Sequence, residues 1–190
     1  MNNKANGHYL IQGTVAPGFE SVRDLYERNM QTLEEKSTQL CVYHKDEKVV
    51  DLWASQDDSF SPDSLINVFS SGKSLETIAM ASLVGQGLLN YATKITDYWP
   101  EFAQSGKEKI TVRCMLSQLA GIPVADEAPV NSLYQLDVIT KALEVQKPMW
   151  KPGSTPCYHS FTHGPLCQKI IELTTGKSMG EFLREDLFGP

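Results

Sequence analysis

The sequence predicts a protein of the mixed α/β (α+β) class, in which a short antiparallel sheet accompanies a mostly helical remainder. Three observations indicate this: a helix-like segment comes first, two short strands follow it, and the later periodic segments have helical spacing. The chain has 190 residues, of which 41% are hydrophobic and 21% are charged. That composition is typical of a globular protein with one core, so we expect a single domain over residues 1–190.

The first part of this domain, about 13–56, is expected to hold a helix and a hairpin. Apolar residues at near-helical spacing, with charges between them, predict a helix over 20–35. The apolar runs in "QLCVYHKDEKVVDLWA" predict strands over 40–43 and 49–53, and the polar "HKDEK" between them predicts a hairpin turn.

The second part, about 64–190, is expected to be helical. From Leu75 onward the apolar positions form two stripes, which predicts a helix buried in the core. The segments that follow are predicted in this order: short helices and turns over 94–102 and 110–123, a helix over 131–145, an irregular loop over 146–160, a helix from about 161 to 175, and a short helix over 179–188.

Charge and composition argue against several functions. The formal net charge is -6 and no basic block is present, so we expect no nucleic-acid partner. No apolar run is long enough to span a bilayer, and "MNNKANGHYLIQG" lacks the apolar core of a secretory signal. We therefore expect a cytoplasmic protein, whose four cysteines are free thiols.

The stretch "FSSGKS" at 69–74 permits two chemical interpretations. As the end of a phosphate-binding loop it would need a glycine five residues before Gly72, but that position is Asn67. As Ser-x-x-Lys, it places Ser70 and Lys73 one turn apart at a helix N-terminus, where a positive partial charge favours a developing oxyanion. We reject the phosphate loop. The pattern alone leaves open a serine N-cap followed by an exposed lysine.

Longer segments carry a resemblance to a known family. They are "NVFSSGKSLETIAMASLVGQGLLN", "ITDYWPEFAQSGKEKITVRCMLSQLAGIP" and "WKPGSTPCYHSFTHGPLCQKIIELTTGKSMGEFLREDLFGP". In this order they resemble the class C and esterase-like branch of the serine beta-lactamase and penicillin-binding-protein superfamily. The resemblance implies a beta-lactamase/transpeptidase-like fold, an antiparallel sheet flanked by helices with a mostly helical insertion.

By this resemblance Ser70 is the nucleophile, Lys73 the lysine of the first motif and Tyr158 the tyrosine of the second. Ser160 stands where many relatives have asparagine and is expected to contact substrate. The implied function is a serine hydrolase that acts through an acyl-enzyme on a small-molecule ester, amide or lactam, with no cofactor and no metal. The alternatives are a non-catalytic relative that acts as a scaffold or binding protein and, least favoured, an unrelated helical binding module.

The sequence departs from the family pattern at two further places. Gln118 replaces a histidine of the family and is expected to have a structural role. The family's third motif, a Lys/His-Thr/Ser-Gly strand, has no counterpart, because "KSMG" at 177–180 lies in a helical context. The chain thus resembles the N-terminal half of the domain, ending before the C-terminal strands, and we expect its sheet to have two strands.

A metal site is a separate hypothesis that we consider and reject. Cys157, His159, His163 and Cys167 follow one another at spacings of two, four and four, which a helix could bring near one face. Cys157, however, is predicted to lie in the loop before the helix. We expect His159 to make structural hydrogen bonds instead.

Overall fold

The structure is a computed structural model that describes residues 10–33, 35–132 and 135–189. The chain divides into two compact units, Met1–Asn67 and Val68–Pro190. This division falls just after the border between the two predicted parts, 13–56 and 64–190. Whether the two units act as one domain stays a prediction.

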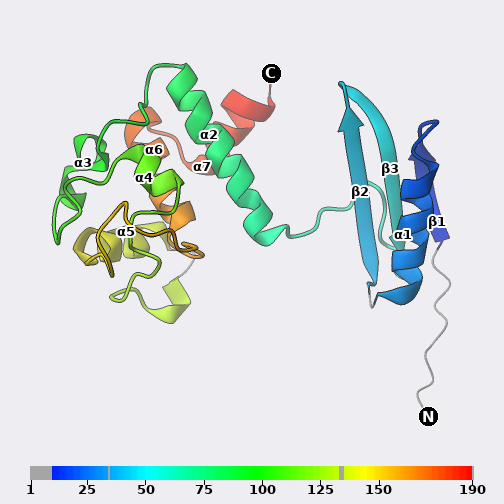
Figure 1. Ribbon diagram of the computed structural model, residues 1–190, viewed down its shortest axis with the longest axis horizontal. Helices are drawn as coiled ribbons and strands as arrows, with labels where there is room; N and C mark the ends of the chain where they lie inside the picture. The colour runs from blue at the N-terminus through cyan, green and yellow to red at the C-terminus, as the bar shows by residue number, and fades with distance from the viewer. Residues whose placement is uncertain (1–9, 34, 133–134, 190) are drawn as a thin grey trace, which may run out of the picture. The chain divides into compact units, whose positions relative to one another are not determined.

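The first unit is a three-stranded antiparallel sheet with one helix (Figure 1). Its elements are β1 (Leu10–Val15), α1 (Glu20–Thr32), β2 (Ser37–His44) and β3 (Glu47–Ser55), with strand order β1-β3-β2. Lys45 and Asp46 form the two-residue turn of the β2–β3 hairpin, both with positive φ, of 50° and 65°. Tyr26 and Met30 of α1 belong to the same buried cluster as the buried residues of β3.

The expectation of a two-stranded sheet is wrong, because β1 also pairs with β3. No strand was predicted over 10–15, and Gly13 lies within it. In the structure Gly13 has a φ of 97°, and a Cβ there would lie 1.9 Å from the carbonyl oxygen of Asp51. The glycine therefore allows close approach of two strands rather than a turn.

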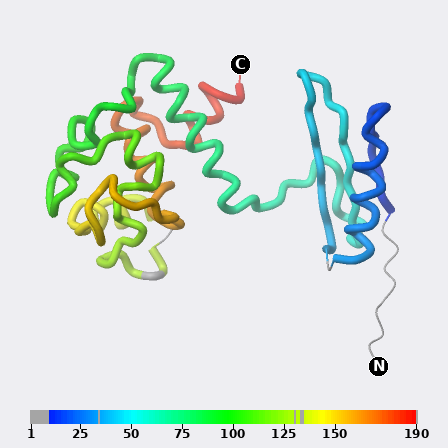
Figure 2. Tube along the Cα trace, in the orientation of Figure 1, coloured from blue at the N-terminus to red at the C-terminus, as the bar shows by residue number. Residues whose placement is uncertain are grey.

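The second unit is helical. Its elements are η1 (Phe69–Gly72), α2 (Lys73–Gly85), α3 (Ile95–Tyr98), η2 (Pro100–Phe102), α4 (Val112–Leu116), η3 (Val130–Ser132), α5 (Leu136–Val145), α6 (His163–Thr175), α7 (Met179–Phe182) and η4 (Leu183–Phe188). The chain between α5 and α6 is an irregular loop, as predicted (Figure 2). Part of the helix predicted over 131–145 lies outside the described residues.

The helix α2 is buried on one face. Ala79, Met80 and Leu83 lie in the main core of this unit, together with apolar residues of α6. Ile78, predicted in the same stripe as Ala79, is 48% exposed. The prediction of a helix buried on both sides is therefore wrong for this unit. None of the described helices is long and apolar enough to cross a membrane.

The segment "KSMG" belongs to a helix start, in agreement with its rejection as a third motif. Ser178 caps α7 in a capping box with Glu181. Lys177 forms ion pairs with Glu185, at 3.1 Å, and with Asp186, at 2.6 Å. These contacts account for the residue types of the segment without catalysis.

A buried lysine closes the end of α5. Lys107 is fully buried, and its ammonium donates hydrogen bonds to three backbone carbonyl groups, those of Gln104, Glu144 and Gln146, at 3.0, 2.9 and 2.8 Å. Burial lowers the pKa of Lys107 to about 8. Glu144 and Gln146 lie at the C-terminal end of α5, where carbonyl groups lack helical partners and a positive charge is favourable.

Candidate active site

Ser70 lies in η1, the 3₁₀ turn that leads directly into α2, and Lys73 is the first residue of α2. Ser70 is exposed, while Lys73 is half-buried. Phe69, immediately before Ser70, has a φ of 45°, a left-handed conformation that bulky residues rarely adopt. Such backbone strain, on the order of 1 kcal/mol, is concentrated at functional sites. The sequence carried no signal for it.

Tyr158 and Ser160 come from the loop before α6 and meet this turn. The ammonium nitrogen of Lys73 lies 3.4 Å from Ser70 Oγ and donates a hydrogen bond of 3.0 Å to the backbone carbonyl oxygen of Ser160. The same nitrogen lies 5.2 Å from the centre of the Tyr158 ring. All four residues that the sequence predicted for the site therefore lie together. Ser160 contributes its carbonyl group to Lys73, a contact that the sequence did not indicate.

The phenol of Tyr158 is made more acidic by these neighbours. Its hydrogen bond with the Ser70 side chain has the largest effect and lowers the pKa of Tyr158 below its ordinary value, and the charge of Lys73 acts in the same direction. Partial burial and the charge of Glu76 oppose this shift. A phenol that ionises more readily than usual can act as a general base.

Two side chains hold the segment that carries Tyr158. Gln118 accepts a hydrogen bond of 2.8 Å from the backbone N–H of His159 through its side-chain Oε1. The backbone carbonyl oxygen of Gln118 accepts another, of 3.2 Å, from the N–H of Cys157. His159 is buried; its Nδ1 donates to the carbonyl oxygen of Cys157, and its Nε2 accepts from the N–H of Ile122. Both residues thus have the structural roles that the sequence predicted. Tyr158 is fixed from both sides.

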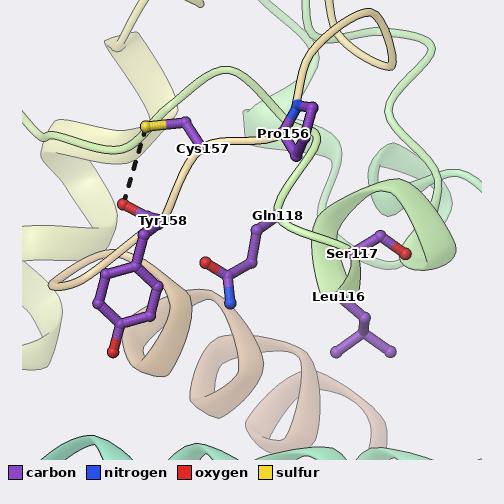
Figure 3. Close-up of a pocket in the computed structure, with 6 residues that line it drawn as sticks. All are labelled: Leu116, Ser117, Gln118, Pro156, Cys157 and Tyr158. Carbon is purple, nitrogen blue, oxygen red and sulfur yellow. Dashed lines mark hydrogen bonds between the residues drawn. The ribbon is translucent and has the colours of Figure 1, made fainter.

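A shallow, open cleft lies beside Tyr158 (Figure 3). It is lined by Leu116, Ser117, Gln118, Pro156, Cys157 and Tyr158. The side chain of Gln118 points along the same side of the loop as the Tyr158 ring (Figure 3). Tyr158, which is exposed, forms one wall of this cleft.

We expect His159 to make folding depend on pH. Burial lowers the pKa of His159 below its value in the unfolded chain, near 6.5. The unfolded chain therefore binds this proton more tightly, and the contribution of His159 to stability is lost as the pH falls below about 6.5. Protonation also removes the acceptor for Ile122 N–H. Urea unfolding at pH 7.5 and pH 5.5 should show a larger loss of stability in the wild type than in the His159→Gln variant, whose amide does not titrate. Equal losses would contradict the assignment.

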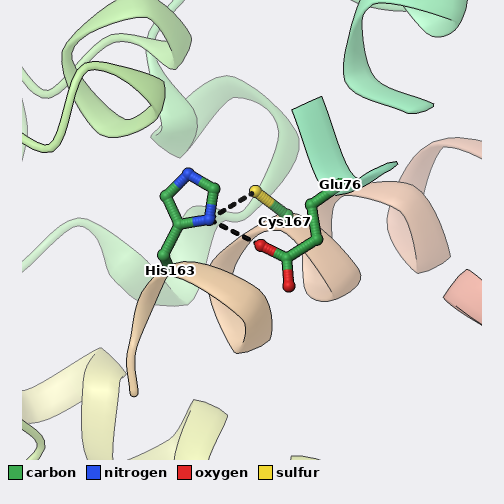
Figure 4. Close-up of side chains that lie close together, drawn as sticks. All are labelled: Glu76, His163 and Cys167. Atoms are coloured by element: carbon green, nitrogen blue, oxygen red, sulfur yellow. Dashed lines mark hydrogen bonds and ion pairs between the residues drawn. The ribbon is translucent and has the colours of Figure 1, made fainter. Parts of the chain in front are cut away.

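One group of described side chains resembles a metal site (Figure 4). Ligand atoms of Glu76, His163 and Cys167 all lie within 4.8 Å of one another. Of the four residues considered as ligands from the sequence, only His163 and Cys167 belong to this group. His159 makes the hydrogen bonds given above. His163 Nδ1 already lies 2.7 Å from Glu76 Oε2 and 3.8 Å from Cys167 Sγ.

The chemistry of this group favours hydrogen bonding over metal binding. Burial raises the pKa of the Cys167 thiol, which keeps it protonated near neutral pH, whereas a metal binds the thiolate. A metal would also have to displace the proton between His163 and Glu76. All four cysteines of the chain are free thiols, as predicted.

Comparison with known proteins identifies the family of the chain. Residues 22–190 match the Beta-lactamase family. The chain belongs to this family, and its fold is the beta-lactamase/transpeptidase-like fold.

Three relatives illustrate the membership. Esterase/beta-lactamase LipL of Mycobacterium tuberculosis (strain ATCC 25618 / H37Rv) is 31% identical over 156 residues, which are 80% of this chain and 36% of that protein. The crystal structure of a family VIII carboxylesterase is 33% identical with a TM-score of 0.87, over 93% of this chain and 50% of that one. A penicillin-binding protein homologue from Caulobacter crescentus is 33% identical with a TM-score of 0.89, over 94% of this chain and 50% of that one. The chain thus spans 50% of the length of each of these two solved structures. It spans 36% of the curated relative.

Proposed function

We propose that the protein is a serine hydrolase that forms an acyl-enzyme on Ser70. One observation carries the proposal: Lys73 contacts Ser70 at 3.4 Å and the Ser160 carbonyl group at 3.0 Å, while its ammonium lies 5.2 Å from the Tyr158 ring. A nucleophile, a cation and a phenol with a lowered pKa meet, although they come from segments 87 residues apart. This is the arrangement required to activate a serine hydroxyl.

Ser70, Tyr158 and Lys73 have distinct roles in the proposed reaction. Tyr158, as phenolate, takes the proton of Ser70 while Oγ attacks the carbonyl carbon of the substrate. The tetrahedral intermediate then collapses, the bond to the leaving group breaks, and Tyr158 returns the proton to the leaving oxygen or nitrogen. Water hydrolyses the acyl-enzyme in a second step. The positive charge of Lys73 favours the phenolate form of Tyr158.

The proposed substrates are small molecules with an ester, amide or lactam bond. An ester is favoured, because the names of two of the relatives include an esterase activity. The side chain of Ser160, half-buried beside Lys73, is proposed to offer its hydroxyl to the substrate. A serine in place of asparagine has fewer hydrogen bonds to offer there, so it would alter substrate preference more than the chemical step.

Covalent labelling of the full-length protein tests the nucleophile. A fluorophosphonate and a penicillin-type probe should each add one adduct mass to the wild type in intact-mass spectra. The Ser70→Ala variant should remain unlabelled. Ser71→Ala is the matched control, since this neighbouring serine is also exposed, and it should label at the rate of the wild type. Labelling that persists in Ser70→Ala would refute the assignment. A folded wild type that takes neither probe would favour the non-catalytic scaffold.

A further inference from the structure

Lys73 has a potential ion-pair partner on its own helix that it does not use. Glu76 follows it by three residues on α2, so the two side chains share a face, where opposite charges readily pair. The ammonium of Lys73 instead contacts Ser70 and the carbonyl group of Ser160. An ion pair with Glu76 would compete directly with these contacts.

The Glu76 carboxylate is held by the first turn of α6 (Figure 4). Its Oε2 accepts a hydrogen bond of 2.7 Å from His163 Nδ1, and the two side chains are 22% and 3% exposed. Its Oε1 lies 3.0 Å from the point where a Cβ on Gly164 would be. The carboxylate therefore lies directly over the backbone of Gly164, in space that a larger residue would narrow.

The location suits a negative charge. The first turn of α6 reads His-Gly-Pro-Leu and carries no acidic side chain of its own. A helix N-terminus has a positive partial charge that favours a carboxylate. Glu76, which comes from α2, supplies this charge. The neighbouring Cys167 thiol is neutral, so it does not compete with the carboxylate for His163.

We propose that Glu76, His163 and Gly164 form a positioning device for the proposed active site. In this device the first turn of α6 holds the Glu76 carboxylate away from Lys73, so the ammonium of Lys73 is free to contact Ser70 and Tyr158. The inference rests on the proposed function. The same contact joins the helix that begins with Lys73 to the segment that follows Tyr158 and Ser160. The position of this charge affects the phenol as well, since the charge of Glu76 raises the pKa of Tyr158.

A double-variant rescue tests the device. His163→Leu removes the donor and frees the carboxylate, so the rate of Ser70 labelling should fall about tenfold, a change of the size expected for one charged hydrogen bond. Glu76→Gln alone should label within about threefold of the wild type, because an amide still accepts from His163 and cannot form an ion pair. Glu76→Gln combined with His163→Leu should recover most of the lost rate. A purely structural role predicts the opposite, with the double variant as slow as His163→Leu or slower.

A second variant and a structural measurement complete the experiment. Gly164→Ala should push the carboxylate aside by a few tenths of an ångström and slow labelling less than His163→Leu does, while Glu172→Gln, which removes a partner of Lys169, is the control without effect. A crystal structure of His163→Leu should show Glu76 paired directly with Lys73, whether or not the protein is active. Ser70-dependent labelling that is unchanged in both variants would overturn the inference and leave the proposed function intact. Absence of Ser70-dependent labelling in the wild type would refute the function, and the crystal structure of His163→Leu would still decide where Glu76 goes.

Discussion

Replacing Tyr158 by phenylalanine should slow the labelling of Ser70 by about 100-fold or more, the usual size of a general-base contribution. The substitution removes only the hydroxyl group, so the ring can keep its position beside the Lys73 ammonium. Tyr158 is 53% exposed, so the stability should change by less than about 0.5 kcal/mol. Labelling kinetics and urea unfolding measure the two effects separately.

The pH dependence of the labelling rate tests whether Tyr158 is the base. The base must be deprotonated, so the wild-type rate should rise with pH. Because Ser70 and Lys73 lower the pKa of Tyr158, the rise should begin below the range of an ordinary phenol. The rise should disappear in Tyr158→Phe. Tyr43→Phe, at an exposed position of the hairpin, is the control and should keep both the rate and its pH profile. A Tyr158→Phe variant that labels at the rate of the wild type would assign the base to another group.

Replacing Lys107 by methionine should lower the free energy of unfolding by about 3 kcal/mol, the cost of removing one partner from a buried, charged hydrogen-bond group. Methionine fills a similar volume but donates no hydrogen bond, so the three carbonyl groups of Gln104, Glu144 and Gln146 lose the donor. The contact of the ammonium with the Phe102 ring, at 4.9 Å, is lost as well.

Urea denaturation monitored by circular dichroism measures this effect. Lys109→Met is the matched control, because Lys109 is exposed two residues further along the chain, and its stability should stay within about 0.5 kcal/mol of the wild type. If Lys107→Met is as stable as Lys109→Met, the three hydrogen bonds do not hold the end of α5.

The sequence predicted the helices, and it named the residues that lie together at the candidate site, because both depend on patterns along the chain. Helical spacing of apolar residues indicated the long helices, and apolar runs on either side of a polar turn indicated the hairpin strands. Ser70, Lys73 and Tyr158 were proposed as site residues because motif residues and their flanking segments resemble a family. Those signals do not require knowledge of three-dimensional contacts, so the prediction of the fold succeeded.

Contacts between distant segments were beyond such patterns. Glu76 and His163 are 87 residues apart, and each alone resembles an ordinary polar residue of a helix. The positive φ of Phe69 is set by the turn around it rather than by its residue type. The strand β1 was not predicted, and its close approach to Asp51 at Gly13 is a contact that the sequence does not indicate. A charged or polar residue at a core-facing helical position is the signal that could have pointed to Glu76.

Gln118 affects the range of pH over which Tyr158 stays in place. The segment around Tyr158 is held by an amide side chain and an imidazole, Gln118 and His159. An amide oxygen accepts a hydrogen bond at any pH, whereas a histidine at position 118 would lose an acceptor on protonation. Of these two side chains, only the imidazole of His159 can take up a proton. The hydrogen bond that Gln118 accepts from His159 N–H therefore does not depend on the protonation of the Gln118 side chain, in acid or at neutral pH.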